Sequence, residues 1–183
     1  MNNKIELLPA EAANLNIIEN LFPYYVYEMS DFLQRAPSEE GLFTFDRESL
    51  NKYQEREDHY PFLIKCNDEI AGFALVRKYP ADPSLYDMEQ FFVLKKFKGL
   101  GVGRLAFEAL VDCFPGQWQI RVLQENERAL AFWGAVVDGV TGGRFVRQVA
   151  DDDGLGMWFF WFGGEGARNA NNSHAAYSRQ WTK

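Results

Sequence analysis

The sequence has few of the residues that build cross-linked or metal-bound domains. Its 183 residues include only two cysteines and two histidines. Two cysteines cannot form the disulfide framework of a small secreted domain, and they cannot supply the four ligands of a structural zinc site. We therefore expect no metal, and we expect Cys66 and Cys113 to be core thiols of a protein from a reducing compartment.

Long apolar runs and an excess of basic residues are also missing. No stretch reaches the roughly 20 apolar residues of a membrane-spanning helix, and the first residues lack the apolar run of a signal peptide. The formal net charge is -7, whereas binding to a phosphate backbone requires a basic face. These absences predict a cytoplasmic protein with no membrane or nucleic-acid partner. The acidic balance is compatible with a cationic, amine-bearing partner.

What is present fits one globular domain. The hydrophobic content of 47% and the aromatic content of 16% can fill a core at this length. From residue 163 onward the chain is rich in Gly, Asn, Ala and Ser, a composition typical of surface or disordered segments. We predict a single domain over residues 1–162 and a surface or disordered tail over residues 163–183.

Apolar periodicity predicts the order of helices and strands. Strands are expected at residues 5–8, 60–66, 69–78, 87–94, 117–124, 144–149 and 155–162. Helices are expected at residues 10–21, 23–35, 102–113 and 127–133, with a further short helix at residues 49–56. This order predicts a mixed α/β fold, with a mostly antiparallel, twisted sheet of about seven strands flanked by about four helices.

A basic, glycine-rich stretch, Lys98-Gly99-Leu100-Gly101-Val102-Gly103-Arg104, joins an expected strand to an expected helix. The first N–H groups of a helix lack intrahelical partners and carry a partial positive charge, so this arrangement favours phosphate binding. A P-loop would need Lys-Ser/Thr after the last glycine, and a dinucleotide fingerprint would need a wider glycine spacing. A connection that only turns the chain is the remaining alternative.

Residues 98–103 resemble Arg/Gln-x-x-Gly-x-Gly/Ala, the pyrophosphate-binding loop of the GNAT superfamily of N-acetyltransferases, with Lys98 in the first position. The expected element order over residues 4–162 also matches the GNAT fold, and residues 87–133 are similar at the level of motifs. The resemblance implies acetyl-CoA as co-substrate. It assigns the pantetheine arm to the main chain of Phe92, Val93 and Leu94, and the phosphates to Lys98, Gly99, Leu100, Gly101, Val102, Gly103 and Arg104.

Two further positions follow from the same resemblance. Asn126 stands where the family contacts the cofactor near its thiol, although asparagine is equally suited to cap the following helix. Trp133 replaces the tyrosine that usually protonates the departing thiolate, and an indole N–H is not a useful general acid. Another residue or solvent then supplies the proton, or the protein is not a competent enzyme.

The reaction implied by the family is direct attack of an amine on a thioester, which needs a base rather than a protein nucleophile. Asp87 and Glu89 share one face of the strand before the glycine loop, and Glu89 is our first candidate. The alternative is that both carboxylates are simply solvated. His59 and His174 are weaker candidates, because both are expected in surface loops.

In relatives the first two helices and the last hairpin select the acceptor. Here they offer Tyr24, Tyr27, Glu28 and Asp31, whose aromatic faces and carboxylates suit a cation, although an aromatic stripe is more often core. We predict an N-acetyltransferase acting on a primary amine of a small molecule or peptide. A non-catalytic CoA-binding or regulatory module is the alternative, and an unrelated nucleotide-binding domain is a third reading. The acceptor, the acyl-chain length and a homodimeric state stay open.

Overall fold

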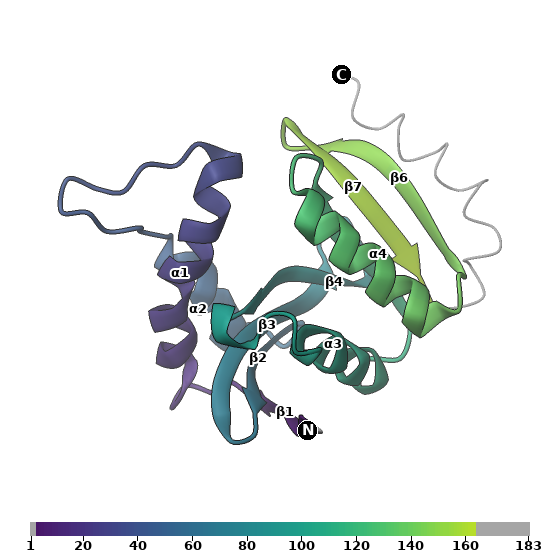
Figure 1. The fold of residues 1–183 in the computed structure, drawn as a ribbon, viewed down its shortest axis with the longest axis horizontal. Coiled ribbons are helices and arrows are strands. Elements are labelled where there is room, and N and C mark those ends of the chain that lie inside the picture. Colours follow the sequence, from purple (N-terminus) through teal and green to yellow (C-terminus); the bar gives the residue numbers. More distant parts are fainter. Residues whose placement is uncertain (1–2, 164–183) are drawn as a thin grey trace.

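The computed structural model describes residues 3–163, which form one seven-stranded sheet flanked by four α-helices (Figure 1). The strands are β1 (Ile5–Pro9), β2 (His59–Cys66), β3 (Glu69–Tyr79), β4 (Asp82–Val93), β5 (Gln117–Leu123), β6 (Phe145–Asp152) and β7 (Leu155–Phe162). The helices are α1 (Leu15–Leu33), α2 (Arg47–Glu55), α3 (Val102–Cys113) and α4 (Glu127–Thr141), with a 3₁₀ turn, η1 (Lys95–Phe97), before α3.

The sheet has the spatial order β1-β2-β3-β4-β5-β7-β6. Every neighbouring pair is antiparallel except β4 and β5, which run parallel. Parallel neighbours need a crossover connection, which here contains α3. The predicted mixed α/β fold with a mostly antiparallel sheet is confirmed, and the seven strands, with helices between them, follow in the predicted order.

Each face of the sheet packs against its own pair of helices. One apolar cluster joins α3 and α4 to the sheet through buried residues such as Phe107, Trp133 and Trp118. A second cluster joins α1 and α2 to the other face through residues such as Ile18 and Leu50. Figure 1 shows α1 and α2 on the left and α3 and α4 on the right, with the middle strands between them. The sheet therefore lies between two helical layers.

The two helices predicted at residues 10–21 and 23–35 are wrong, because the structure has one helix, α1, with Pro23 inside it. Proline removes one intrahelical hydrogen bond. The apolar stripe nevertheless continues through Ile18, Phe22 and Val26, all buried, at a spacing of four residues. Burial of that stripe on both sides of Pro23 holds the helix together. The second helix before β2 is α2, close to the short helix expected at residues 49–56.

Other boundaries also differ from the prediction. Helix α4 continues past the expected end at Trp133 to Thr141, because it ends where Gly142 adopts the left-handed conformation at φ 59°. Cys113 is exposed at the end of α3 and is not a core thiol, whereas Cys66 is buried. The tight β2–β3 turn is confirmed, with Asn67 and Asp68 at positive φ. No helix within residues 3–163 is long and apolar enough to cross a membrane.

Candidate functional site

The sheet opens between β4 and β5. Their parallel pairing ends at Met88↔Ile120, although β4 continues to Val93. At the same place a β-bulge interrupts the pairing of β4 with β3, because Leu75 pairs with Gln90 while Val76 pairs with Met88. The extra residue is Glu89. A bulge bends its strand, so β4 leaves β5 at Glu89 and has an open edge beyond it.

Main-chain groups of β4 face this opening. The Leu94 N–H donates to the Ala71 carbonyl at 2.8 Å, toward β3. Because hydrogen-bonded pairs alternate along an antiparallel ladder, the groups of Phe92 also face β3. Those of Phe91 and Val93 therefore face the open edge. Of the three residues predicted to bind pantetheine through their main chain, Val93 faces the open edge. Phe92 faces β3, and the Leu94 N–H already donates to Ala71.

The glycine loop closes one end of the opening. Gly99 and Gly101 both have φ 78°, where other residues are strained. The first turn of α3 starts with the Leu105 N–H, which donates to the Gly101 carbonyl at 3.0 Å. Within the described chain, five neighbouring N–H groups have no acceptor: those of Gly99, Gly101, Val102, Gly103 and Arg104. Free amides at a helix N-terminus form a site for an anion.

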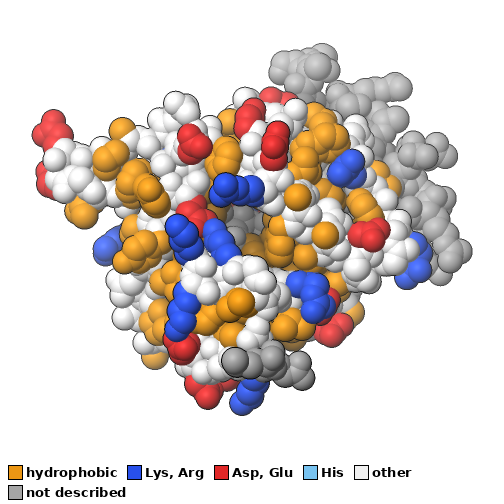
Figure 2. Space-filling view, viewed as in Figure 1, with side chains coloured by type: hydrophobic (Ala, Val, Ile, Leu, Met, Phe, Trp, Pro, Cys, Tyr) orange, Lys and Arg blue, Asp and Glu red, His pale blue; other side chains and the backbone are white. Residues whose placement is uncertain are grey.

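Close packing fixes the position of this loop. A Cβ on Gly103 would lie 3.1 Å from the ring of Phe132 on α4, so the first turn of α3 sits against that ring. The Lys98 ammonium pairs with Glu28 of α1, and the Arg104 guanidinium pairs with Glu108 one turn along α3. Figure 2 shows lysine and arginine side chains gathered around a hollow in the middle of this face. The loop thus presents unpaired amides beside basic side chains, as an anion site requires.

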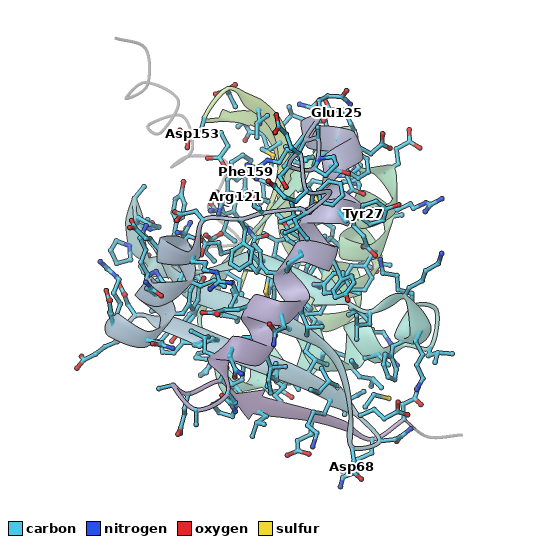
Figure 3. The ribbon with its side chains drawn as sticks, turned by 90° about the vertical axis from the view of Figure 1, so that its left-hand side faces the viewer. Tyr27, Asp68, Arg121, Glu125, Asp153 and Phe159 are labelled. Atoms are coloured by element: carbon cyan, nitrogen blue, oxygen red, sulfur yellow. The ribbon has the colours of Figure 1, made fainter. Side chains whose placement is uncertain are left out.

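A buried ionic cluster lies where the two strands separate. The Asp87 carboxylate is fully buried and accepts hydrogen bonds from Arg77 (3.1 Å) and Arg121 (2.8 Å). Arg121 also donates to Asp152 of β6 at 2.7 Å, so the cluster joins four strands. Figure 3 shows Arg121 next to Phe159, its partner across β5 and β7. This cluster ties the strands together at the base of the opening.

Glu89 lies at the bulge and is held by two donors. One carboxylate oxygen pairs with Arg77 at 2.6 Å, and the other accepts from the Tyr53 hydroxyl of α2 at 2.5 Å. Burial and the negative charge of Glu89 raise the pKa of the Tyr53 phenol well above its ordinary value, so this phenol stays a donor. The side chain of Glu89 remains 26% exposed, whereas that of Asp87 is 0% exposed. Of the two predicted carboxylates, only Glu89 can reach a ligand.

Comparison with known proteins identifies the family. The family model described as "Acetyltransferase (GNAT) family" matches residues 26–135, which is more than half of the chain. The chain belongs to the GNAT acetyltransferase family. The match spans the open strand, the glycine loop and the first part of α4, and the predicted resemblance is confirmed. GNAT acetyltransferases use acetyl-CoA.

Solved GNAT structures share the fold at low sequence identity. An acetyltransferase from Thermus thermophilus is 18% identical, with a TM-score of 0.63 over 87% of this chain and 96% of that one. The spermidine N-acetyltransferase from Vibrio cholerae, solved with CoA and spermine, is 17% identical, with a TM-score of 0.60 over 86% and 94%. The ribosomal-protein-S18-alanine N-acetyltransferase from Escherichia coli is 17% identical, with a TM-score of 0.55 over 88% and 97%. None of the curated proteins matches the sequence.

Two positions predicted from GNAT motifs have defined structural roles here. The Asn126 side-chain oxygen accepts from the Ala129 N–H at 3.0 Å, so this residue caps α4 as the alternative reading proposed. Trp133 is buried, with its ring 5.2 Å from Phe91 and 5.0 Å from Phe107. Neither of these neighbouring phenylalanine rings carries an ionisable group. Trp133 therefore packs beneath the open edge of β4.

The predicted acceptor residues do not lie together in a pocket of this GNAT protein. Tyr24 and Tyr27 are 60% and 62% exposed on the outer side of α1, and Asp31 is also exposed. Glu28 is paired with Lys98. A cavity of about 250 Å³ is instead lined by the inner side of α1, the segment before α2, and Gln90 of β4. Its apolar lining consists of Phe22, Tyr25, Val26, Met29, Leu33 and Phe45.

The prediction for His59 is wrong, because it is buried at the start of β2 rather than in a surface loop. Its Nδ1 lies 2.7 Å from the Asp58 carboxylate, and its ring packs edge-on against Tyr53. A larger cavity of about 490 Å³ is lined by His59 and Tyr53, but not by Glu89 or the glycine loop. His174 lies outside the described residues.

The sequence prediction missed the partners of the two carboxylates, which are Tyr53, Arg77, Arg121 and Gln119, and it missed Asp152, which accepts from Arg121. One signal was available for Arg121, because it is a charged residue in a strand whose other face is apolar. No local pattern marked Tyr53 or Arg77. Among residues 3–163, no group of three or more His, Cys, Asp or Glu side chains is arranged to hold a metal ion.

Proposed function

We propose that the protein is an acetyl-CoA-dependent N-acetyltransferase, which transfers the acetyl group to a primary amine by direct attack. The single observation that supports this most is the open edge of β4 ending at five unpaired amides of the glycine loop. An extended chain carrying amides at one end and phosphates at the other fits that arrangement. The predicted cytoplasmic location belongs to the same proposal.

The residues present fit the CoA part of the co-substrate. The main-chain groups of Phe91 and Val93 would pair with the pantetheine amides, as an added β-strand does. The free amides from Gly99 to Arg104 would hold the pyrophosphate, and exposed Lys95, which has no ion pair within the described residues, adds positive charge nearby. When bound, acetyl-CoA supplies an acetyl group activated as a thioester.

Glu89 is our proposed general base. Its carboxylate, at the point where the strands separate, can accept a proton from the ammonium group of the acceptor. Arg77 and Tyr53 are positioning residues, because they fix both carboxylate oxygens. Asp87 is assigned a structural role, because it is fully buried between two arginines. The acceptor would approach from the α1–α2 side, where Glu89 and Tyr53 lie.

A non-catalytic CoA-binding module remains the second candidate, because Trp133 offers no ionisable group at the position of the usual tyrosine. The variant Trp133→Tyr distinguishes the two. If the protein is a working N-acetyltransferase, the parent already releases CoA when an amine is present, and the variant has a similar turnover. If the parent is inactive only because it lacks a proton donor, the variant has a much higher turnover than the parent.

The loop itself is tested by Gly101→Val with Gly154→Val as matched control. Both glycines have positive φ, 78° and 82°, and neither has another atom within 4 Å of an added Cβ, so both variants bear the same backbone strain. Acetyl-CoA at a hundredfold excess over Kd should stabilise the parent protein by about 2.7 kcal/mol. We expect Gly154→Val to keep this shift and Gly101→Val to lose it. Equal shifts in both variants would remove the loop from the proposal.

A further inference from the structure

The 250 Å³ cavity beside Glu89 has an apolar floor. The ring centroids of Phe22 and Phe45, which both line it, lie 4.6 Å apart, and Phe73 of β3 stacks on Phe22 from behind. Ligand pockets for drug-sized molecules usually measure about 300–1,000 Å³. This cavity therefore suits one small apolar group rather than a long chain.

The cavity and Glu89 belong to the same site. The bulge places Gln90, next to Glu89, on the face toward α1, where Gln90 lines the cavity. Tyr25 of α1 also lines it, with its ring edge-on to Phe92 of β4 at 6.2 Å. Burial first, and then the negative charge of Glu89, raise the pKa of Tyr25 to about 12. The Tyr25 hydroxyl is thus close enough to Glu89 to experience its charge.

One unpaired cation stands at the rim of the cavity. Arg35, which follows α1, lines the cavity, and its guanidinium has no hydrogen bond or ion pair within residues 3–163. Two other polar residues of the lining already make hydrogen bonds, since Asp46 caps α2 by accepting from the Glu48 N–H, and the Ser49 hydroxyl donates to the Asp46 carbonyl. Tyr25, Arg35 and Gln90 line the same cavity, so this cation and the residue next to Glu89 face one space.

We propose that the acceptor is an apolar α-amino acid, with its amine at Glu89, its side chain in the cavity and its carboxylate on Arg35. This rests on the proposed N-acetyltransferase function and names its substrate class. A guanidinium binds a carboxylate through two parallel hydrogen bonds. A polyamine fits poorly, because a second ammonium group would meet the Arg35 charge. A residue within a peptide lacks the free carboxylate.

The test compares L-leucine with L-leucinamide, which keeps the amine and the side chain but lacks the carboxylate. CoA release is measured with the full chain, acetyl-CoA and each acceptor, for the parent protein, for Arg35→Gln and for Arg47→Gln. Arg47 is an exposed arginine at the start of α2 that does not line the cavity, so its variant is the control. Spermidine, L-lysine and L-phenylalanine complete the panel.

We expect kcat/KM for leucine to exceed that for leucinamide by about ten- to a hundredfold, the range of a hydrogen bond to a charged group. Arg35→Gln should remove this preference by lowering the value for leucine alone, and Arg47→Gln should keep it. Phenylalanine should be accepted, and spermidine and lysine should be poor acceptors.

The failures separate the two proposals. Good turnover of spermidine or leucinamide, with leucine no better and Arg35→Gln without effect, overturns the amino-acid acceptor and leaves the N-acetyltransferase function intact. CoA release that no member of the panel raises above background, in a protein that acetyl-CoA stabilises, overturns the amino-acid acceptor and favours the non-catalytic CoA-binding module. A protein that acetyl-CoA does not stabilise overturns the N-acetyltransferase function itself.

Discussion

At the scale of single residues, two carboxylates that the sequence places on one face of the same strand have different surroundings. Asp87 and Glu89 are two residues apart on β4, and both contact Arg77. Asp87 is enclosed by Arg77 and Arg121 without access to solvent, whereas Glu89 at the bulge is 26% exposed. One therefore stabilises the fold, and the other is available for chemistry.

Glu89→Gln should lower kcat by at least about a hundredfold, because a positioned general base contributes about 10²–10⁴-fold. The affinity for acetyl-CoA should stay the same, since the change does not touch the glycine loop. Steady-state kinetics and a thermal shift with acetyl-CoA measure the two effects. Glu6→Gln, an exposed change on β1, serves as control. Unchanged kcat in Glu89→Gln would exclude this carboxylate as the base.

Asp87→Asn should lower the free energy of unfolding by about 3–5 kcal/mol, because it leaves two largely buried arginines without their shared anion. Urea denaturation measures the change. Asp112→Asn, at an exposed position of α3, should stay within about 0.5 kcal/mol of the parent protein. A loss for Asp87→Asn as small as the control would show that Asp87 does not hold the strands together.

The Tyr25 phenol gives the stability a dependence on alkaline pH. Its pKa is raised from 10.0 to about 12 in the folded state, chiefly by burial. Between these two values the unfolded chain releases a proton that the folded chain keeps, so stability present below pH 10 is lost as pH rises toward 12. In urea titrations across that window, Tyr25→Phe should show a shallower loss than the parent protein. An identical slope would contradict a protected Tyr25.

At the scale of elements, α1 and β4 each contain an irregularity that sets the position of the site. Pro23 interrupts the hydrogen bonds of α1. The bulge at Glu89 reverses the alternation of β4, so that Met88 packs against the α3–α4 layer while Glu89 and Gln90 both face α1 and α2. Without this extra residue, Gln90 and Glu89 could not face the same side.

Pro23→Ala should stabilise the protein by about 1–2 kcal/mol, because alanine restores a helical N–H in the middle of α1, although it also frees the unfolded chain. Pro37→Ala, in the segment between α1 and α2, gains no such bond and should give no stabilisation. Urea denaturation of both variants measures the difference. A gain in Pro37→Ala equal to that in Pro23→Ala would contradict the explanation from α1.

At the scale of the whole molecule, the sheet separates two apolar clusters, and the opening between β4 and β5 lies where both layers meet it. The cluster beneath α3 and α4 supports the glycine loop, and the cluster beneath α1 and α2 supports the cavity beside Glu89. All seven strands and both clusters lie within residues 3–163. We propose that this part of the chain is a single domain, as the predicted boundary at residue 162 implies.

A chain shortened to end at Gly163 should therefore keep the urea midpoint and the acetyl-CoA thermal shift of the full chain. Circular dichroism during denaturation and a thermal shift with acetyl-CoA check both points. A chain shortened further, to end before β6 at Thr141, should not fold, because β7 would be missing beside β5. Loss of folding in the Gly163 chain would place part of the domain beyond that residue.

Local sequence patterns were enough to predict most of the elements and the glycine loop, because these depend on neighbouring residues. Apolar patterns typical of strands indicated all seven strands. Gly99 and Gly101 marked the turn before α3, because glycine readily takes the left-handed conformation found there. The same local reasoning split α1 at Pro23, since the burial that holds the helix together comes from the sheet beneath it.

Which side chains meet at the site depends on long-range packing instead. Tyr53 and Glu89 are 36 residues apart, and Arg121 and Asp87 are 34 apart, so no local pattern could pair them. The cavity on the inner side of α1 could not be predicted either. The sequence shows which side of a helix is apolar, but not which segments pack against that side. The distinction between Asp87 and Glu89 came from burial and from a one-residue bulge, and both exist only once β3, β4 and β5 are assembled.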